Sequence, residues 1–358
     1  MVFFCNLLFS LSYTYWLDRR VKNFNISGKS FFLSLVPLFF IWLLICGGQY
    51  AVGTDYYSYL YIFDNVESLA DYYDLKGEFG FIDIIRLCNF FGLHGQSLFY
   101  VFYGISFLFL YQILKRIRDK KIFIFVLLYI TVTSLFNNQL NGLRQSVAIY
   151  IGTYASLLIF EHKHSKGLLF ILFAMSIHIS SIVFLLVYLH KCVMRIKPLG
   201  LFFIMGICLI AGIFLTESQF DVFIPYLPDS YARHIISGLS THTLLQKITK
   251  YIFIPIYLLA IGSYRRYKMT PLEMTLFNIG VISFSLRLLL INIGIVSRLF
   301  DSFLLLSIFP LCIYMRYLFS HKKHTFLFIS ISFALLLLYF LKTIVSPAGE
   351  YLYQSIYM

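Results

Sequence analysis

The stretch GLRQSVAIYIGTYASLLIF, residues 142–160, decides the fold because it is a helix-length apolar run with a single charge, that of Arg144. About 20 apolar residues span a bilayer. A guanidinium costs at least about 2.5 kcal/mol at the membrane centre, and it does not escape that cost by losing its proton. Arg144 therefore needs a water-filled cavity or an anionic partner. Residues 137–141, NNQLN, carry no carboxylate, so we expect the anion to be a substrate, and phosphate suits a bidentate guanidinium.

The composition of the whole chain predicts a polytopic helical membrane protein. Its 358 residues are 60% hydrophobic and 13% charged, whereas soluble domains carry roughly 25% charged residues. Strands of a membrane barrel would alternate over about 10 residues, and these apolar runs are longer and continuous. We predict an all-α bundle of about 10–11 membrane-spanning segments, forming one domain over residues 1–358. The expected spans lie near 1–17, 31–48, 96–114, 122–136, 142–160, 199–216, 250–264, 271–292, 297–315 and 324–341.

Basic connectors orient these spans, because Lys and Arg collect in cytoplasmic loops. The formal charge of +13 therefore indicates topology rather than a nucleic-acid partner. Two longer loops, 49–95 and 217–249, are expected on the extracytoplasmic side, and the first is rich in Asp and Glu. The cysteines are scattered without a CxxC or a His/Cys cluster, so neither a metal site nor a disulfide framework is indicated. The expected cytoplasmic connectors hold Arg19 and Arg20, residues 115–121, Lys163 and Lys166, Arg265 and Arg266, and Arg316 with Lys322 and Lys323.

Segment 167–189 fits this topology only if it does not cross the membrane once. A single crossing would place the basic stretch 190–197 outside, and every later basic loop on the wrong side. The polar break Ser176-Ile177-His178-Ile179-Ser180-Ser181 allows a turn, and irregular backbone at membrane depth requires a covering of protein or a cavity. We predict a re-entrant or broken helix with His178 near its tip. A single span with one misplaced loop is the alternative.

The charged residues within apolar stretches are candidate site residues, and each also has an ordinary structural explanation. Arg144, with Asn141 and Gln145 beside it, either lines a polar cavity or extends to the interface. His178 is either a base or phosphate donor, or a buried neutral imidazole. Arg298 and Asp301 share a helix face, either as an intrahelical pair or as an anion site with its orienting carboxylate. Arg287 is a third cavity cation or the partner of Asp301.

The acidic loop contains residues suited to binding sugars. It begins Gly53-Thr54-Asp55-Tyr56-Tyr57 and continues to Glu78-Phe79-Gly80-Phe81. Aromatic rings stack on sugars, and carboxylates accept their hydroxyl hydrogen bonds. The alternative is a solvated loop with tyrosines at the lipid interface; we prefer it for most of the acidic residues and except Asp55 and Glu78. No DxD, Walker A, GxSxG or GxGxxG motif is present, so we expect no cofactor and no metal.

These stretches together resemble the EpsG family of polysaccharide polymerases, which is related in role to the Wzy O-antigen polymerases. The resemblance rests on residues 53–57 and 78–81, on NGLRQSVA at 141–148, on IHISS at 177–181 and on SRLF at 297–300. It implies a multi-pass glycosyltransferase of the bacterial inner membrane. Such enzymes transfer a growing glycan from undecaprenyl diphosphate to a lipid-linked repeat unit, making O-antigen, capsule or exopolysaccharide. A chain-length regulator of the polysaccharide co-polymerase type is an implied partner.

For a polymerase of this kind, Arg144 and Arg298, with Arg287, neutralise the leaving diphosphate, an electrostatic role that is often the largest catalytic contribution. Asp55 is expected to act as the base, and His178 to contact phosphate or support the structure. Tyr56, Glu78, Asn141, Gln145 and Asp301 complete the substrate site. Two other functions use the same features. A flippase for lipid-linked glycans needs cavity cations but no base, and a membrane O-acyltransferase needs a histidine facing a cytoplasmic acyl donor.

Overall fold

The computed structural model describes residues 1–24, 28–117, 121–215, 244–293, 299–347 and 349–357. Regular secondary structure in these ranges is helical, apart from an isolated β-bridge between Gln49 and Ser355, so the all-α prediction is confirmed. Five of the described helices are long and apolar enough to cross a membrane, and shorter apolar helices accompany them. The five are Lys29–Gly47, Gly95–Ile117, Leu143–Phe160, Pro271–Leu289 and Lys322–Val345.

The chain divides into two compact units. Unit 1 comprises Met1–Leu185 and Met315–Met358, and unit 2 comprises Leu186–Tyr314. The expectation of a single functional domain over residues 1–358 stays a prediction.

Unit 1 is built around the helix that contains Arg144. In this helix, α9 (Leu143–Phe160), 83% of the residues are buried, the highest share among the five helices named above. It packs against α6 and α10, while α1 packs on α7 and α2 packs on α6. The further bounds are α1 Val2–Phe24, α2 Gly28–Gly47, α6 Gly95–Ile117, α7 Ile122–Thr131, α8 Leu135–Asn138, α10 His164–Ile177 and α20 Thr325–Phe340.

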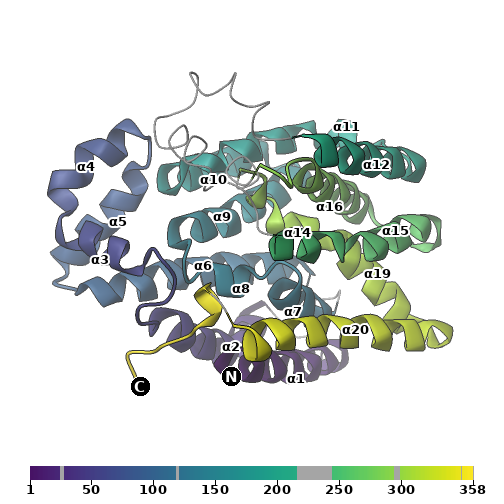
Figure 1. The fold of residues 1–358 in the computed structure, drawn as a ribbon, viewed down its shortest axis with the longest axis horizontal. Coiled ribbons are helices and arrows are strands. Elements are labelled where there is room, and N and C mark those ends of the chain that lie inside the picture. Colours follow the sequence, from purple (N-terminus) through teal and green to yellow (C-terminus); the bar gives the residue numbers. More distant parts are fainter. Residues whose placement is uncertain (25–27, 118–120, 216–243, 294–298, 348, 358) are drawn as a thin grey trace. The chain divides into compact units, whose positions relative to one another are not determined.

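The region expected as a long extracytoplasmic loop is mostly helical. It forms α3 (Tyr56–Asp64), α4 (Val66–Leu75) and α5 (Phe79–Phe90), which lie together at the left of Figure 1. Aromatic packing joins them to the rest of unit 1. The ring centre of Phe81 lies 5.5 Å from that of Tyr73 on α4 and 5.6 Å from that of Phe102 on α6. Tyrosines that suggested an interfacial loop therefore also supply a buried aromatic core.

The predicted break at His178 is confirmed, and the chain turns back there. Helix α10 ends at His178, whose backbone is extended, and a 3-10 helix follows over Ile179–Leu189. Gly167 packs against Ile159 near one end of α9, whereas the ring of Phe184 packs against Gly152 near its middle. His178 lies between these two contacts in the chain, and it meets the Arg144 end of α9 through the side chain of Glu78. Residues 167–177 therefore run toward the Arg144 end of α9, and residues 179–184 run back from it.

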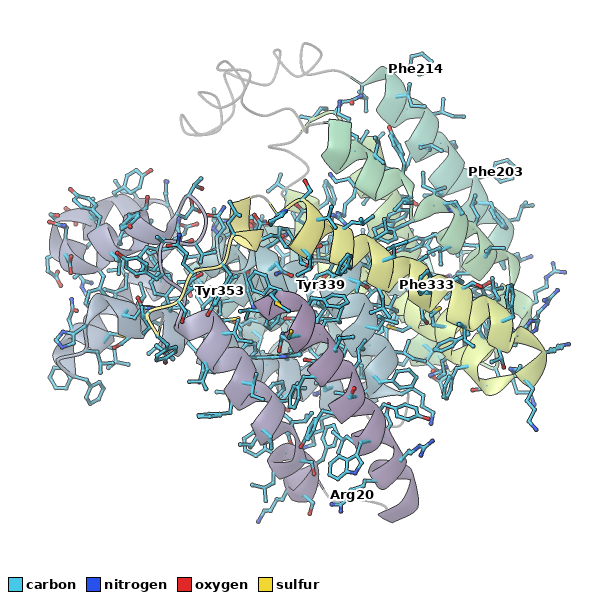
Figure 2. All side chains as sticks on the ribbon, turned by 60° about the horizontal axis from the view of Figure 1, so that its bottom comes forward. Arg20, Phe203, Phe214, Phe333, Tyr339 and Tyr353 are labelled. Atoms are coloured by element: carbon cyan, nitrogen blue, oxygen red, sulfur yellow. The ribbon has the colours of Figure 1, made fainter. Side chains whose placement is uncertain are left out.

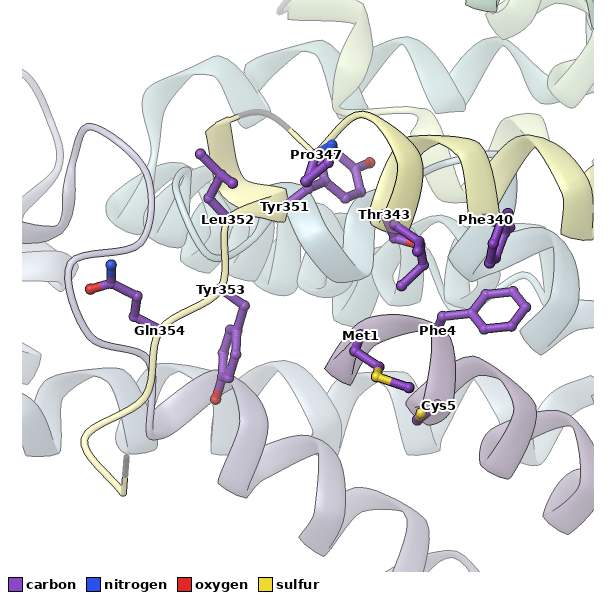
Figure 3. Close-up of a pocket in the computed structure, with 11 residues that line it drawn as sticks. Met1, Phe4, Cys5, Phe340, Thr343, Pro347, Tyr351, Leu352, Tyr353 and Gln354 are labelled. Atoms are coloured by element: carbon purple, nitrogen blue, oxygen red, sulfur yellow. The ribbon is translucent and has the colours of Figure 1, made fainter.

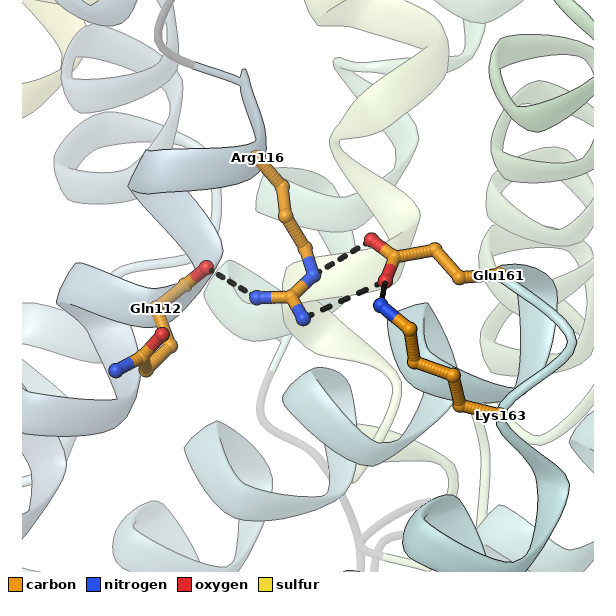
Figure 4. A network of polar contacts seen from close by, with 4 residues as sticks. All are labelled: Gln112, Arg116, Glu161 and Lys163. Atoms are coloured by element: carbon orange, nitrogen blue, oxygen red, sulfur yellow. Dashed lines mark hydrogen bonds and ion pairs between the residues drawn. The ribbon is translucent and has the colours of Figure 1, made fainter. Parts of the chain in front are cut away.

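The opposite end of α9 carries the basic connectors. The Nε atom of Arg116, at the end of α6, lies 2.7 Å from Oε1 of Glu161, and Nζ of Lys163 lies 2.8 Å from Oε2 of the same carboxylate (Figure 4). This cluster ties α6 to the turn between α9 and α10. The positive-inside rule predicts that this is the cytoplasmic end of unit 1, and Arg144 lies at the other end of α9.

The C-terminal residues return to the start of the acidic region. The amide of Tyr50 donates to the carbonyl of Gln354 at 3.0 Å, and the amide of Ile356 donates to that of Gly48 at 2.9 Å. Together with the N-terminus of α1 and the end of α20, this segment encloses an open groove of about 590 Å³ (Figure 3). Its lining is mostly apolar and includes Phe4, Phe340 and Tyr351, and none of the predicted site residues lines it.

Unit 2 centres on α16 (Pro271–Leu289), which packs on α12 (Pro198–Phe214) and α11 (His190–Met194). The close approach of α12 depends on Gly212, where a Cβ would collide with the carbonyl of Leu288. Phe203 and Phe214 on α12 are 62% and 71% exposed, as expected for a lipid-facing surface, and both are labelled in Figure 2. The remaining described α-helices of unit 2 are α14 Leu244–Tyr251, α15 Ile254–Gly262 and α18 Leu304–Ser307. Helix α19 (Phe309–Ser320) begins in unit 2 and ends in unit 1.

Candidate functional site

A buried carboxylate joins the two most informative residues of the sequence. Glu78, at the N-terminal end of α5, is 3% exposed. Its Oε2 accepts a hydrogen bond of 2.6 Å from Nη1 of Arg144, and its Oε1 lies 2.8 Å from Nδ1 of His178. The amide of Ile179 donates to the same Oε1 at 3.2 Å. Three separate segments, the start of α5, the start of α9 and the end of α10, therefore meet at one carboxylate.

Aromatic rings hold the Arg144 guanidinium in place. Its central carbon lies 4.8 Å from the ring centre of Phe81 and 5.1 Å from that of Tyr73. Tyr73 lies on α4 and Phe81 on α5. The arginine therefore links α9 to these helices, which together with α3 we call the outer helices. The Nε atom is buried without a hydrogen-bond partner among the described residues. Stacking and the ion pair together fix the side chain as a rigid element of the site.

The backbone break gives His178 its orientation. A carboxylate at neutral pH only accepts hydrogen bonds, so Nδ1 of His178 carries a proton and donates it toward Glu78. The second ring nitrogen, Nε2, then remains for another partner, and the side chain is 20% exposed. A carboxylate that orients one imidazole nitrogen and leaves the other for chemistry is the arrangement of a general base.

The electrostatics of the site keep Glu78 ionised. Burial opposes its ionisation, but the hydrogen bond from His178 and the charge of Arg144 outweigh burial and lower the pKa of Glu78 to about 2. The carboxylate is therefore negative throughout the physiological pH range. Burial also raises the pKa of the neighbouring Tyr59 hydroxyl, against the opposing charge of Arg144, so this hydroxyl remains a proton donor.

Asp55 and Asn141 form a second junction beside this site. The Oδ1 atom of Asn141 accepts hydrogen bonds from the amides of Thr54 at 2.8 Å and Asp55 at 3.0 Å. Gly53 precedes this turn with φ of +73°, and a Cβ there would come within 2.5 Å of the same Oδ1. Asn141 lies one helical turn before Arg144, so this junction fixes the start of α3 against the start of α9. Asp55 itself is half-buried and accepts a hydrogen bond from the Thr54 hydroxyl.

Two further predicted residues lie near these junctions. The hydroxyl of Tyr56 donates to Gln96 at 2.8 Å, and its ring stacks on Phe99 with centroids 5.1 Å apart. Tyr56 is 2% exposed, so it holds α3 on α6 rather than presenting a face to a sugar. Gln145 is half-buried in the first turn of α9, next to Arg144.

The remaining predicted residues lie in unit 2 or outside the described residues. Nε of Arg287 pairs with Oδ1 of Asp301 at 2.9 Å, and both side chains are largely buried. Of the two roles considered for Arg287 from the sequence, a third cavity cation or the partner of Asp301, the structure shows the pairing with Asp301. Arg298 lies outside the described residues.

The structure corrects one expectation about Arg144. The sequence before it holds no carboxylate, which led us to expect an anionic substrate as its counter-charge. The counter-charge is Glu78, which lies 66 positions earlier in the chain. Glu78 was predicted as a sugar ligand and not as this partner, because the pairing depends on tertiary folding of the outer helices and has no local sequence signature.

Comparison with known protein families identifies the family of this chain. The model of the EpsG family matches residues 31–355, nearly the whole chain. Searches of curated proteins and of solved structures give no significant match.

Proposed function

The chain belongs to the EpsG family, which makes it a membrane polysaccharide polymerase in general terms, and we propose that it is a glycosyltransferase acting on lipid-linked sugar repeat units. The donor is a glycan on undecaprenyl diphosphate, and the acceptor is a hydroxyl of another lipid-linked unit. The reaction takes place on the outer face of the cytoplasmic membrane. The product is O-antigen, capsule or exopolysaccharide.

The observation that carries this proposal is the ionised Glu78 carboxylate held between Arg144 and His178. Nε2 of His178 takes the proton of the acceptor hydroxyl as its oxygen bonds to the anomeric carbon of the donor. The bond from that carbon to the diphosphate breaks, and the diphosphate leaves with the electron pair. Glu78 orients the imidazole and stabilises its protonated form, while Arg144 keeps Glu78 ionised and in place.

This proposal exchanges two roles that the sequence suggested. Asp55 was expected as the base and His178 as a phosphate or structural contact. The carboxylate bound to Nδ1 favours His178 as the base, since no comparable orienting group is present for Asp55 among the described contacts. Asp55 is the second candidate, and its position beside Asn141 suits binding of the acceptor sugar.

The position of His178 also bears on the two other functions considered. An O-acyltransferase requires the histidine to face a cytoplasmic acyl donor. His178 lies instead at the end of α9 opposite Glu161 and Lys163, which favours the polymerase. A flippase requires no base, so it predicts that His178→Gln retains activity.

The test is the in vitro extension of purified lipid-linked repeat units by the full-length protein in nanodiscs. We expect wild type to make long chains, and we expect His178→Gln to reduce the rate by about 10²–10⁴, the usual contribution of a general base. The matched control is His94→Gln, which removes an exposed histidine from the same predicted side. Equal extension by wild type and His178→Gln would refute the assigned mechanism.

A further inference from the structure

The groove between α1, the end of α20 and the C-terminal segment, residues 349–357, has a surface suited to a hydrocarbon chain. Its volume of about 590 Å³ lies within the roughly 300–1,000 Å³ of pockets that bind small molecules. None of the described residues that line it is charged. On one side the ring centre of Phe4, on α1, lies 5.2 Å from that of Phe340, on α20. Tyr351 to Gln354 of the C-terminal segment line the other side (Figure 3).

Two polar side chains of the lining are already engaged by the backbone. The hydroxyl of Thr343 donates to the carbonyl four residues earlier at 2.8 Å, and that of Tyr353 donates to the carbonyl of Ile45 at 2.8 Å. Lys342, next to Thr343, does not line the groove and donates to the hydroxyl of Ser134 at 3.2 Å. An uncharged surface whose hydroxyls are bonded elsewhere favours a hydrocarbon chain over a sugar or an anion.

The wall formed by the C-terminal segment is held in place by the rest of unit 1. The ring of Phe3, on α1, lies 6.4 Å from that of Tyr351 and 5.2 Å from that of Tyr353. The amide of Tyr50 donates to the carbonyl of Gln354 at 3.0 Å. The groove is therefore formed by contacts within the protein. A preformed apolar site binds a chain without an added cost for ordering its walls.

The groove also continues the lipid-facing surfaces of two helices. Along α20 and the π-helical turn after it, exposed apolar side chains recur every three or four residues up to the groove. They are Phe326, Ile329, Phe333, Leu337, Leu341 and Val345. On α1, Cys5, Leu8 and Phe9 are exposed in the same way, and Cys5 also lines the groove. Residues at this spacing share one helix face, and in a membrane protein such an apolar face is covered by lipid.

We propose that this groove binds an acyl chain of a bilayer phospholipid, whose head group stays at the membrane interface. An isoprenyl chain of a lipid-linked diphosphate is the other source of hydrocarbon. Its anion requires cations beside the chain, and none of the described lining residues supplies one. The groove lies at the end of α20 away from Lys322 and Lys323. This is the predicted outer end, so the phospholipid comes from the outer leaflet.

The experiment locates the bound chain by photolabelling. The full-length protein is placed in phosphatidylcholine nanodiscs that contain a small fixed fraction of phosphatidylcholine with a diazirine at the end of one acyl chain. Peptide mass spectrometry then locates the adducts, which we expect on Phe4 and on Tyr353. Cys5→Trp/Leu352→Trp fills the groove. We expect it to lower the yield of these adducts at least about tenfold, the effect of keeping about two methylene groups out of an apolar site.

The matched control is Leu8→Trp/Leu337→Trp, which places the same side chains on the exposed faces of α1 and α20 outside the groove. It should give the wild-type yield on Phe4 and Tyr353. Cys5→Trp alone changes one exposed position and serves as the second variant if the double variant does not fold.

Two results would overturn the proposal. One is an equal yield of groove adducts in wild type and in the variants that fill the groove. The other is loss of the wild-type adducts when undecaprenyl phosphate is added at the same fraction as the probe, which would assign the groove to an isoprenyl chain. Retention of the adducts under that addition is the expected result. Neither measurement uses a glycan, so the inference is tested independently of the proposed reaction.

Discussion

The side chains of Glu78 and His178 meet at 2.8 Å although the residues are 100 positions apart in the chain. The contact requires that the outer helices fold onto the rest of unit 1 and that the chain reverses its direction after α10. It orients the imidazole of a histidine that lies alone in an apolar segment. The role of Glu78 in catalysis, its ion pair with Arg144, and its charge can each be tested separately.

Replacing Glu78 should weaken catalysis through His178. In Glu78→Gln the amide loses the negative charge that stabilises the protonated imidazole, so we expect chain extension to slow by at least about tenfold. Glu67→Gln is the matched control, because Glu67 pairs with Arg86 on the exposed face of the outer helices. Initial extension rates at several pH values measure the effect. An unchanged rate and pH profile in Glu78→Gln would contradict the role given to the carboxylate.

Breaking the ion pair from one side should cost stability. Glu78→Ala leaves the Arg144 guanidinium without its partner, and we expect the free energy of unfolding to fall by about 3–5 kcal/mol. Arg144→Ala/Glu78→Ala removes both charges, so its loss should be smaller than the sum of the single losses. Denaturant titration in detergent micelles measures the two single variants and the double variant. Strict additivity would show that the two side chains do not stabilise one another.

The charge of Glu78 should also appear as a pH dependence of stability. Its pKa falls from an ordinary value of 4.5 to about 2 in the folded protein. The stabilisation is therefore fully present above about pH 4.5 and is lost as the pH falls toward 2, by about 3 kcal/mol at 1.36 kcal/mol per pKa unit. Thermal unfolding measured between pH 7 and pH 3 should show this decline in wild type. Glu78→Gln should show a smaller decline, and an equal decline would contradict the assignment.

Gly53 should be intolerant of a side chain for two separable reasons. Gly53→Ala places a methyl group within 2.5 Å of the Asn141 oxygen in addition to imposing a left-handed backbone on alanine. Gly92 has φ of +65°, but no atom lies within 4 Å of the position that a Cβ would take there, so Gly92→Ala carries the backbone cost alone. We expect Gly53→Ala to lose about 1–3 kcal/mol more than Gly92→Ala. Melting temperatures of the two variants provide the comparison, and equal losses would refute the steric contribution.

The sequence predicts the helices of unit 1 well, because hydropathy and helix length depend on local residues. The break at His178 was also predictable, since the distribution of basic loops favours a turn over a single crossing by segment 167–189, and residues 176–181 are a polar interruption of its apolar sequence. Helices α3 to α5 were not predicted. Their apolar residues are separated by acidic and tyrosine residues that also suit a loop, and only packing of Phe81 on Tyr73 and Phe102 distinguishes the two.

The sequence identified the residues of the candidate site better than it identified the contacts between them. Arg144, His178 and Glu78 were all named from the sequence, yet their pairing depends on three segments far apart in the chain.

The central claim is that His178 is the base of a glycan polymerase. The most direct measurement is the length distribution of surface glycan in cells that lack this gene and carry wild type, His178→Gln or His94→Gln. We expect a full ladder with wild type and His94→Gln, and a single capped repeat unit with His178→Gln at equal protein level. A full ladder with His178→Gln would contradict the claim.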